Sequence, residues 1–401
     1  MPRRHDIDAL RALAFALVIV YHVGMYYVAG WHYHLKSPHA AAWLQLPMVA
    51  LNLWRMDLVF LVSGLAFAIL RRRRTPGALA RERSLRLLPP LAFGMAVVVP
   101  YQPYAQGVAN GLVAPGFGDF LRRYYGGGAW PRGAFDGWEH GVTWNHLWYL
   151  AYLWVYTVVL AALLPLLDRL DATIGLRRRL VGLRGPALLL APAVPLALYA
   201  LVLQPGFPAT HDLVHDAWLH AQYATVFLYG YWIGLDEGVW AEAVRLRWRS
   251  LGLAAGLLAL HLAVRGTPLA RIDGLRPLWR MLACGYLWAM VLAILGFAHC
   301  HLNRPWPLLA WANASVYPWY MLHQTLLIVL IVQLAPLGLG PVTEPALLLM
   351  GTVAGCALVT AGVRRVRWLR PLFGLPRQAV APHTHEKARR EGGLAGQRTG
   401  R

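Results

Sequence analysis

The stretch ALRALAFALVIVYHVGMYYV, residues 9–28, decides the fold class. At the α-helical rise of 1.5 Å per residue, its twenty residues span about 30 Å, the thickness of the hydrocarbon core of a bilayer. The run follows Met1-Pro-Arg-Arg as a signal peptide would, but it is longer than the apolar region of such a peptide and contains Arg11 and His22. We therefore interpret it as a membrane span that the protein retains.

Nine further apolar runs follow the first. The third, fifth and seventh are the least regular, because Pro89, Pro90, Pro192 and Pro195 interrupt two of them and the seventh is short. The sequence predicts an all-α fold, a polytopic membrane helix bundle of about ten transmembrane helices. We place these spans near residues 9–29, 46–70, 87–104, 146–167, 186–204, 217–236, 250–265, 279–299, 306–334 and 344–363.

The composition also favours a membrane protein. Of the 401 residues, 58% are hydrophobic and 14% are charged, whereas a soluble domain carries about a quarter charged residues. The formal net charge of +20 comes from 38 Lys and Arg against 18 Asp and Glu, but the basic residues form short clusters between apolar runs, which disfavours nucleic-acid binding. The three cysteines have neither the spacing of a zinc site nor that of a disulfide framework.

The distribution of Lys and Arg predicts the orientation of the chain. With the N-terminus in the cytoplasm, 28 of these residues fall in cytoplasmic segments and 6 on the opposite face. This asymmetry predicts a multi-pass protein with both termini in the cytoplasm. Residues 1–376 form the membrane domain in this interpretation, and residues 377–401, which are polar and rich in Gly and Arg, form a disordered basic cytoplasmic tail.

Ionisable side chains inside the predicted spans indicate a candidate site. Each costs about 2.5–3.5 kcal/mol on insertion scales, so each needs a partner or a function. Arg11 and His22 are eleven residues apart, close to three helical turns, and therefore lie on one face of the first span. A lone histidine on an apolar helix more often packs than reacts, but an imidazole in a dry interior can also act as a general base near neutral pH.

Two other spans carry polar side chains. In the second span Arg55 and Asp57 point about 200° apart, so we expect Asp57 to find its partner on another helix. Arg55 fits either an interhelical clamp or substrate binding. In the ninth span Pro318 is expected to kink the helix, and a second intramembrane histidine favours either a catalytic site or the proton relay of a transporter. The polar residues of this span are Asn313, Ser315, Tyr317, Tyr320, His323 and Gln324.

Further candidate binding residues lie at the ends of spans. Arg83 and Arg86 in the first cytoplasmic loop fit the binding of phosphates, although orientation in the membrane and lipid contact are the more general explanation of such a cluster. On the opposite side, Asn145 and His146 lie at the entrance of the fourth span, after a segment rich in glycine and aromatic residues. Aromatic faces can stack on sugar rings, and they also form the ordinary interfacial belt of membrane proteins.

The sequence gives no sign of a metal site or of common catalytic loops. His32 and His34 would project the same way from an extended loop, but no carboxylate or cysteine beside them completes a ligand set, so we predict no metal. The chain also contains no Gly-x-Ser-x-Gly elbow, phosphate-binding loop or dinucleotide fingerprint.

Taken together, the motifs resemble those of the integral-membrane acyltransferase-3 family over roughly residues 5–365. The ordered set is specific, although each piece alone is weak. It comprises Asp8-x-x-Arg11 with His22 after ten further residues, Phe60-Leu-Val-Ser63-Gly64, Arg83-x-x-Arg86 ahead of Pro89, Asn145-His-Leu-Trp-Tyr-Leu, and Ser315-x-Tyr317-x-x-Tyr320-x-x-His323. Segments such as Asp6-Ile-Asp-Ala-Leu-Arg and Asn52-Leu-Trp-Arg-Met look closest to the glucan biosynthesis protein C group, which succinylates osmoregulated periplasmic glucans.

The resemblance implies an acyltransferase of the bacterial inner membrane that moves an acyl group, succinyl by the branch resemblance, from cytoplasmic acyl-CoA to hydroxyls of a periplasmic glucan. His22 would be the general base, with Arg11 and His323 as further catalytic residues. The implied substrate-binding residues are Arg55, Arg83, Arg86, Asn145, His146, Ser315, Tyr317 and Tyr320. No cofactor is expected to stay bound, because acyl-CoA is a co-substrate. The expected partners are acyl-CoA, the glucan or another polysaccharide, the lipid bilayer and glucan-synthesis proteins, with no nucleic acid.

Two alternatives stay open. One keeps the enzyme but makes it an O-acetyltransferase of another cell-surface polysaccharide, since no residue separates a succinyl from an acetyl donor. The other is a transporter or flippase that moves an acyl group or lipid-linked sugar without chemistry. It predicts inverted repeats and broken helices in both halves of the chain, which only the ninth span, with Pro318, partly fits.

Overall fold

The computed structural model describes residues 4–265 and 267–377, and within them every regular secondary-structure element is helical. The predicted all-α fold is therefore confirmed. The predicted tail, residues 377–401, lies almost entirely outside the described residues. The helices are α1 (His5–Tyr27), α2 (Gln45–Asn52), α3 (Arg55–Arg71), α4 (Pro76–Phe93), α5 (Tyr101–Ala109), α6 (Phe117–Gly126), α7 (Trp148–Ile174), α8 (Leu176–Val181), α9 (Pro186–Leu190), α10 (Ala193–Val202), α11 (Ala217–Gly234), α12 (Glu237–Arg265), α13 (Arg276–Leu302), α14 (Leu309–Leu334) and α15 (Thr343–Arg365).

Each of the ten predicted spans coincides with helical residues in the structure. Among the described residues, seven helical segments are long and apolar enough to cross a membrane by length and composition. The three that fall outside this group are α9 with α10, which Pro192 separates, α11, which is rich in Tyr and Trp, and α12, whose first half is charged. The number of ten spans and the orientation therefore stay predictions.

The third span differs from the expectation that Pro89 and Pro90 interrupt it. Helix α4 runs through both prolines to Phe93, and the irregularity comes one turn later, as a π-helical turn over Gly94–Val98. A proline lacks the backbone N–H and crowds the preceding turn, and a widened turn nearby is one way for a helix to absorb this. The widened turn ends two residues before Pro100 and leads into α5.

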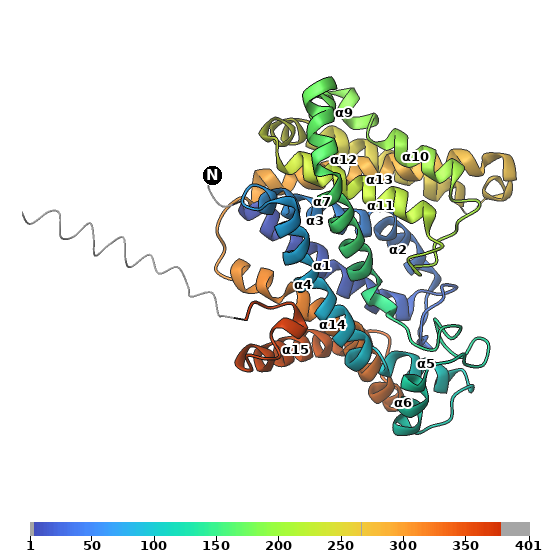
Figure 1. Cartoon of the computed structure of the whole chain (residues 1–401). Coiled ribbons are helices and arrows are strands. Elements are labelled where there is room, and N and C mark those ends of the chain that lie inside the picture. The colour runs from blue at the N-terminus through green and yellow to red at the C-terminus, as the bar shows by residue number, and fades with distance from the viewer. Residues whose placement is uncertain (1–3, 266, 378–401) are drawn as a thin grey trace, which may run out of the picture.

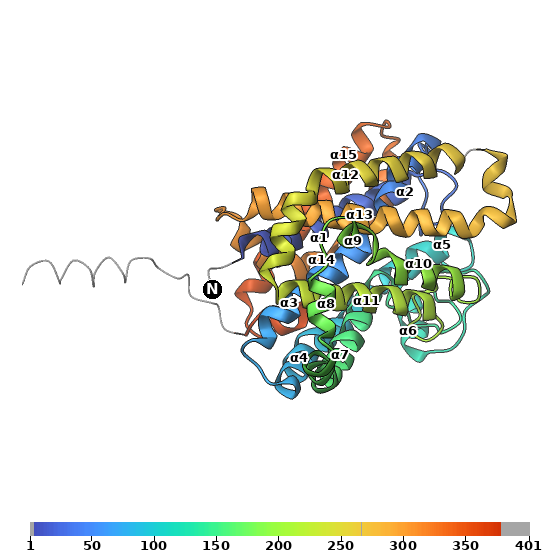
Figure 2. The ribbon, with the colours of Figure 1, turned by 90° about the horizontal axis from the view of Figure 1, so that it is seen from above.

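Helix α1 lies at the centre of the bundle. It contacts α2, α3, α13, α14 and α15, and Figure 1 shows it between α10–α13 above and α14 and α15 below. Seen from above in Figure 2, α12 and α13 run side by side across the top of the bundle. Because Arg11 and His22 are both on α1, they can meet side chains from several other helices.

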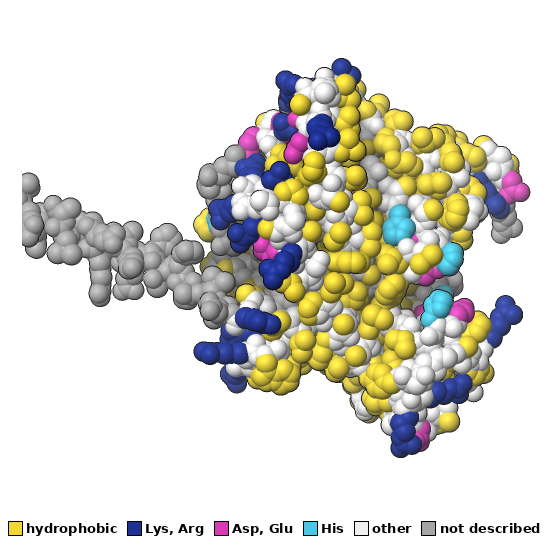
Figure 3. Space-filling model, viewed as in Figure 1, with side chains coloured by type: hydrophobic (Ala, Val, Ile, Leu, Met, Phe, Trp, Pro, Cys, Tyr) yellow, Lys and Arg dark blue, Asp and Glu magenta, His cyan; other side chains and the backbone are white. Residues whose placement is uncertain are grey.

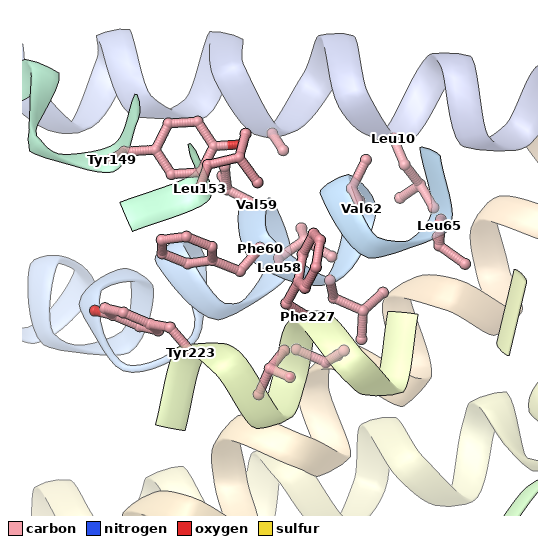
Figure 4. Close-up of a cluster of buried hydrophobic side chains, with 14 of the residues drawn as sticks. Leu10, Leu58, Val59, Phe60, Val62, Leu65, Tyr149, Leu153, Tyr223 and Phe227 are labelled. Atoms are coloured by element: carbon pink, nitrogen blue, oxygen red, sulfur yellow. The ribbon is translucent and has the colours of Figure 1, made fainter. Parts of the chain in front are cut away.

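The tightest helix contact in the core joins α3 and α11. A Cβ atom added at Gly64 would lie 2.0 Å from the carbonyl oxygen of Phe227, and one added at Gly230 would lie 2.0 Å from that of Leu61. Small residues let two backbones approach in this way inside a membrane, where the hydrophobic effect does not drive helices together. Beside this contact, Figure 4 shows Phe60 between the rings of Tyr149 and Tyr223 at centroid distances of 4.9 and 4.6 Å.

Charged side chains gather at one end of the molecule. In Figure 3 most of the Lys and Arg side chains on the visible face lie toward the N-terminus, and a broad apolar surface follows them. Histidine side chains show around a recess at the opposite end. A basic rim beside an apolar band is the pattern expected of a protein that crosses a membrane.

Replacing Gly230 by alanine should destabilise the protein, because the new methyl group must push α3 and α11 apart. Overpacking of this kind costs about 1–3 kcal/mol. Thermal unfolding in detergent, followed by fluorescence-detected gel filtration, measures the change. Gly252→Ala on α12 is the matched control, since nothing lies within 4 Å of a Cβ added there, and it should be neutral or mildly stabilising. Equal midpoints for the two variants would contradict the close contact.

Candidate functional site

A cavity of about 1140 Å³ lies at the end of the bundle where the histidines gather. The C-terminal part of α1 contributes His22, and the turn before α7 contributes Asn145 and His146. Gln324 of α14 and Trp148 of α7 complete this part of the wall. The structure therefore brings together, from separate segments, polar side chains whose insertion into a membrane costs free energy.

Three histidines form a cluster beside the cavity, and two of them, His22 and His146, line it. The ring of His323 on α14 lies 5.0 Å from that of His22 and 5.0 Å from that of His146, centroid to centroid. His323 is buried at 1% exposure, His146 at 5%, and His22 is partly exposed to the cavity. Of the three, His22 is the ring that a ligand in the cavity meets most readily.

Hydrogen bonds fix which nitrogen of two rings carries the proton. Nδ1 of His22 lies 2.8 Å from the carbonyl oxygen of Val18, and Nδ1 of His323 lies 2.7 Å from that of Tyr320. A carbonyl oxygen only accepts, so both Nδ1 atoms donate and both Nε2 atoms of the neutral rings keep a lone pair. Nε2 of His323 lies 3.3 Å from Nδ1 of His22. Nε2 of His22 has no hydrogen-bond partner in the part of the chain that the structure describes, which is what a general base requires.

His146 is held differently, with both ring nitrogens occupied. Its Nε2 donates to the carbonyl oxygen of Met321 at 3.1 Å, so its Nδ1 accepts from the amide of Gln102 at 3.2 Å. The Oε1 atom of Gln102 accepts in turn from Asn145 and from Gln324. His146 and Asn145 thus belong to a network of neutral polar groups in the cavity wall. Sequence reasoning missed Gln102, although a glutamine inside a predicted span was a usable signal.

The loop histidines meet a carboxylate that the sequence did not reveal. Asp136 lies 2.8 Å from His32 and 3.3 Å from His34, although about one hundred residues separate it from them in the chain. Burial lowers the pKa of the His34 imidazole, and the charge of Asp136 offsets this only in part. His34 also meets Gln106 at 2.8 Å and Gln324 at 2.8 Å, which joins this group to the wall network. Within residues 4–265 and 267–377, no group of three or more His, Cys, Asp or Glu side chains is placed to hold a metal ion.

A second cluster, of arginines, lies near the other end of α1. The Cζ atoms of Arg11 and Arg86 each lie 5.2 Å from the centre of the Tyr317 ring, and Arg83 acts electrostatically on the same tyrosine. Arg83 is buried at 4% exposure. Among the described residues, none of the three arginines has a carboxylate within 4.0 Å, unlike Arg4, which pairs with Asp6. Three cationic groups without acidic partners form a site suited to an anion.

Two serines of the sequence motifs have structural partners. Ser63 donates to the carbonyl oxygen of Val59 and lies 2.6 Å from the hydroxyl of Tyr149. Ser315 donates to the carbonyl oxygen of Trp311 and accepts from Arg364 at 2.9 Å. Ser315 lines neither the large cavity nor the small one, of about 10 Å³, beside Arg11 and Arg83. The structure therefore does not bring Ser315 to either cluster.

An aromatic contact separates the arginine cluster from the histidine cluster. The rings of Phe15, Tyr149 and Tyr320 pack edge to face at centroid distances of 5.9, 5.5 and 5.6 Å. The hydroxyl of Tyr320 donates to the carbonyl oxygen of His146, so it is committed to the structure. Along α1 the two clusters are about 16 Å apart, by the helical rise between Arg11 and His22.

Arg55 is a fourth arginine without a carboxylate partner among the described residues, and it lies beside the histidines. It is 6% exposed, and its Cζ lies 3.3 Å from the centre of the Tyr21 ring. Its Nε and Nη1 atoms have no hydrogen-bond partner in the described part of the chain. Asp57 accepts instead from Gln222 of α11 at 3.0 Å, so its partner is on another helix, as expected. The charge of Arg55 is close enough to act on both His22 and His323.

Comparison with known proteins adds one finding. Residues 4–361 match the family model described as "Acyltransferase domain". Neither the curated proteins nor the solved structures give a significant match. The matched range runs from the start of α1 into α15, so it contains both clusters and the cavity.

Proposed function

Because this chain belongs to the acyltransferase-3 family and is a membrane acyltransferase, we propose that it transfers a succinyl group from cytoplasmic acyl-CoA to hydroxyls of a periplasmic glucan. The observation that carries the proposal is the state of His22. Its Nδ1 is held by the carbonyl oxygen of Val18, and its Nε2, beside the cavity, has no partner among the described residues. The same helix carries Arg11 in a cluster suited to the anionic donor.

The arrangement supports direct transfer in one attack. Nε2 of His22 takes the proton of an acceptor hydroxyl while the hydroxyl oxygen attacks the thioester carbonyl carbon. The C–O bond forms, the C–S bond breaks, and the imidazolium returns the proton to the departing CoA thiolate. The products are an ester and CoA thiol, so atoms and charge balance. The bond from Nδ1 to Val18 keeps the ring oriented throughout.

The donor approaches from the arginine cluster in this proposal. Arg11, Arg83 and Arg86 hold phosphate groups of CoA, since charge-assisted hydrogen bonds to phosphate are stronger than neutral ones. The volume beside Arg11 and Arg83 is about 10 Å³, which is too small for a thioester, and Phe15 packs on Tyr149 next to it. The acyl end can therefore reach His22 only when these rings move apart.

Arg83→Gln should raise the KM for acyl-CoA about tenfold and leave the KM for the acceptor unchanged. The loss of one hydrogen bond to a charged group is worth about 1.5–3 kcal/mol, and 1.4 kcal/mol is tenfold in affinity. Steady-state release of CoA thiol measures both constants. Arg81→Gln is the matched control on the same helix, because Arg81 is exposed. A donor KM that Arg83→Gln leaves unchanged would count against phosphate binding at this cluster.

A reconstituted assay tests the proposal as a whole. The full chain in lipid nanodiscs receives succinyl-CoA and a purified periplasmic glucan, and we expect release of CoA thiol together with succinylated glucan in the mass spectrum. Acetyl-CoA in parallel tests the alternative donor, and other surface polysaccharides test the alternative acceptor. Absence of both thiol release and modified glycan, with any donor and acceptor, would refute an acyl-transfer function and favour transport.

A further inference from the structure

Two loops at the cavity contain the strained backbone of the protein. Asn145, His211 and Leu213 are the non-glycine residues with φ in the left-handed region, at 42°, 59° and 73°, in the part of the chain that the structure describes. Asparagine tolerates this conformation, but it strains the backbone of histidine and leucine, and such residues cluster at functional sites. Asn145 and His211 both line the cavity.

The backbone of His211 is held on both sides. Its N–H donates to Oδ2 of Asp216 at 2.7 Å, and its carbonyl oxygen accepts from the indole of Trp144 at 2.9 Å. Asp216 is fully buried, and it also accepts from the hydroxyl of Tyr152 at 2.5 Å and from the N–H of Thr210 at 2.6 Å. Trp144 precedes Asn145, so the indole ties the two strained loops together. These contacts hold the backbone of His211 in its left-handed conformation.

The side chain of His211, unlike its backbone, is available. Its ring lies 4.3 Å from the ring of Trp148, centroid to centroid, at the wall of the cavity that contains His22. Neither of its ring nitrogens has a hydrogen-bond partner among the described residues. The two other histidines nearby are engaged, since His215 pairs with Asp212 at 2.6 Å and His220 meets Tyr156 and the carbonyl oxygen of Leu213.

The charge of the cavity indicates what His211 meets. No lysine or arginine of the described residues lines it, whereas three carboxylates do: Asp136, Glu139 and Asp212. An anionic ligand is repelled by such a wall, and a neutral polyhydroxylated ligand is not. The wall also offers neutral amides and three indoles, those of Trp138, Trp144 and Trp148, which suit hydroxyl groups and the apolar faces of sugar rings.

We propose that His211 is an acceptor-binding residue whose imidazole hydrogen-bonds hydroxyls of a neutral sugar, and that Asp216 and Trp144 position it. The inference rests on the proposed function, in that the cavity receives the acceptor. The loop that contains His211 thus holds the sugar against the wall while a neighbouring hydroxyl faces His22. The strained backbone holds the imidazole of His211 in its binding position before the ligand arrives.

Binding without turnover tests the assignment. In a His22→Ala background, a neutral β-linked glucose oligosaccharide is titrated against the full chain in nanodiscs, with tryptophan fluorescence as the readout. His211→Gly should weaken binding about tenfold, the effect of about 1.4 kcal/mol from lost hydrogen bonds. It should not lower the thermal midpoint, because glycine adopts this φ without strain. His211→Asn, which tolerates the backbone and keeps a donor and an acceptor, should recover part of the affinity, and His215→Ala should change nothing.

The outcomes separate this inference from the proposed function. Oligosaccharide affinity that neither His211→Gly nor His211→Asn alters, or no binding by the parent protein, would overturn the assignment. If His211→Gly lowers the thermal midpoint, the comparison of His211→Asn with the parent decides the question. Binding that depends on His211, in a protein whose unmutated form transfers no acyl group, would count against the proposed function alone.

Discussion

His22→Ala is expected to reduce acyl transfer by about 10²–10⁴-fold, the range that general acid–base catalysis contributes. The physical reason is the hydrogen-bond geometry of the ring. Val18 fixes the proton on Nδ1, so Nε2 presents a lone pair at the cavity, and no other ring of the cluster does so. His146 has both nitrogens occupied, and His323 is buried at 1% exposure. Release of CoA thiol at saturating donor and acceptor measures the loss.

A histidine elsewhere in an apolar helix provides the control. His261 of α12 lines neither cavity, so His261→Ala should retain activity. The His22→Ala protein should also keep its thermal midpoint within a few degrees, because His22 is partly exposed and loses only its contacts with the carbonyl oxygen of Val18 and with Nε2 of His323. Near-normal turnover by a folded His22→Ala protein would remove His22 as the base. His323→Ala should then be examined as the alternative.

The fold class was predictable because few kinds of backbone structure can cross a bilayer. A span must be helical and about 20 residues long, so each apolar run translates directly into a helix. The predicted bounds differ from the structure where a helix contacts other helices instead of lipid. Helix α12 begins at Glu237, well before the predicted start at residue 250, because its charged first turns pack against other helices. For example, Trp240 is 1% exposed, and the carboxylate of Glu242 accepts hydrogen bonds from the N–H of Gly185 and from the guanidinium of Arg245.

The sequence predicted the site only through ionisable residues whose insertion into a membrane costs free energy. Arg11, His22 and His323 are expensive inside a membrane, and each proved to belong to a cluster. Their grouping was visible in part, since helical spacing places Arg11 and His22 on one face. By contrast, His34 and Asp136 come from loops, where no period relates position to direction. The position of the His211 side chain depends on its positive φ angle, which no pattern in the sequence predicts.

The two ends of the site differ in charge, and this difference suits an ordered reaction. Arginines without acidic partners surround Tyr317 at one end, whereas the large cavity has carboxylates and no lysine or arginine among its described lining. In the proposed reaction, the first end would attract an anionic thioester and the second would admit a neutral sugar. The packed rings of Phe15 and Tyr320 keep the two regions apart.

Arg55→Met is expected to lower kcat/KM for succinyl-CoA by more than about 100-fold, while transfer from acetyl-CoA changes by less than about tenfold. Removing one partner of a buried, hydrogen-bonded charge pair costs about 2–5 kcal/mol, and 1.4 kcal/mol is tenfold. Among the described residues Arg55 has no carboxylate partner, and its charge acts on His22 and His323, so we propose that the distal carboxylate of a succinyl group at His22 pairs with it. An acetyl group has no such carboxylate.

The stability of the same variant distinguishes recognition from a structural role. A buried cation without an acidic partner destabilises the fold, and an apolar side chain of similar length removes that cost, so the thermal midpoint of Arg55→Met should stay equal or rise. Arg55→Lys should retain the charge but lose the planar fork that binds a carboxylate with two hydrogen bonds, and should give an intermediate donor preference. If both donors lose activity equally, or the midpoint falls with them, Arg55 stabilises α1 against α3 through Tyr21 and does not select the acyl group.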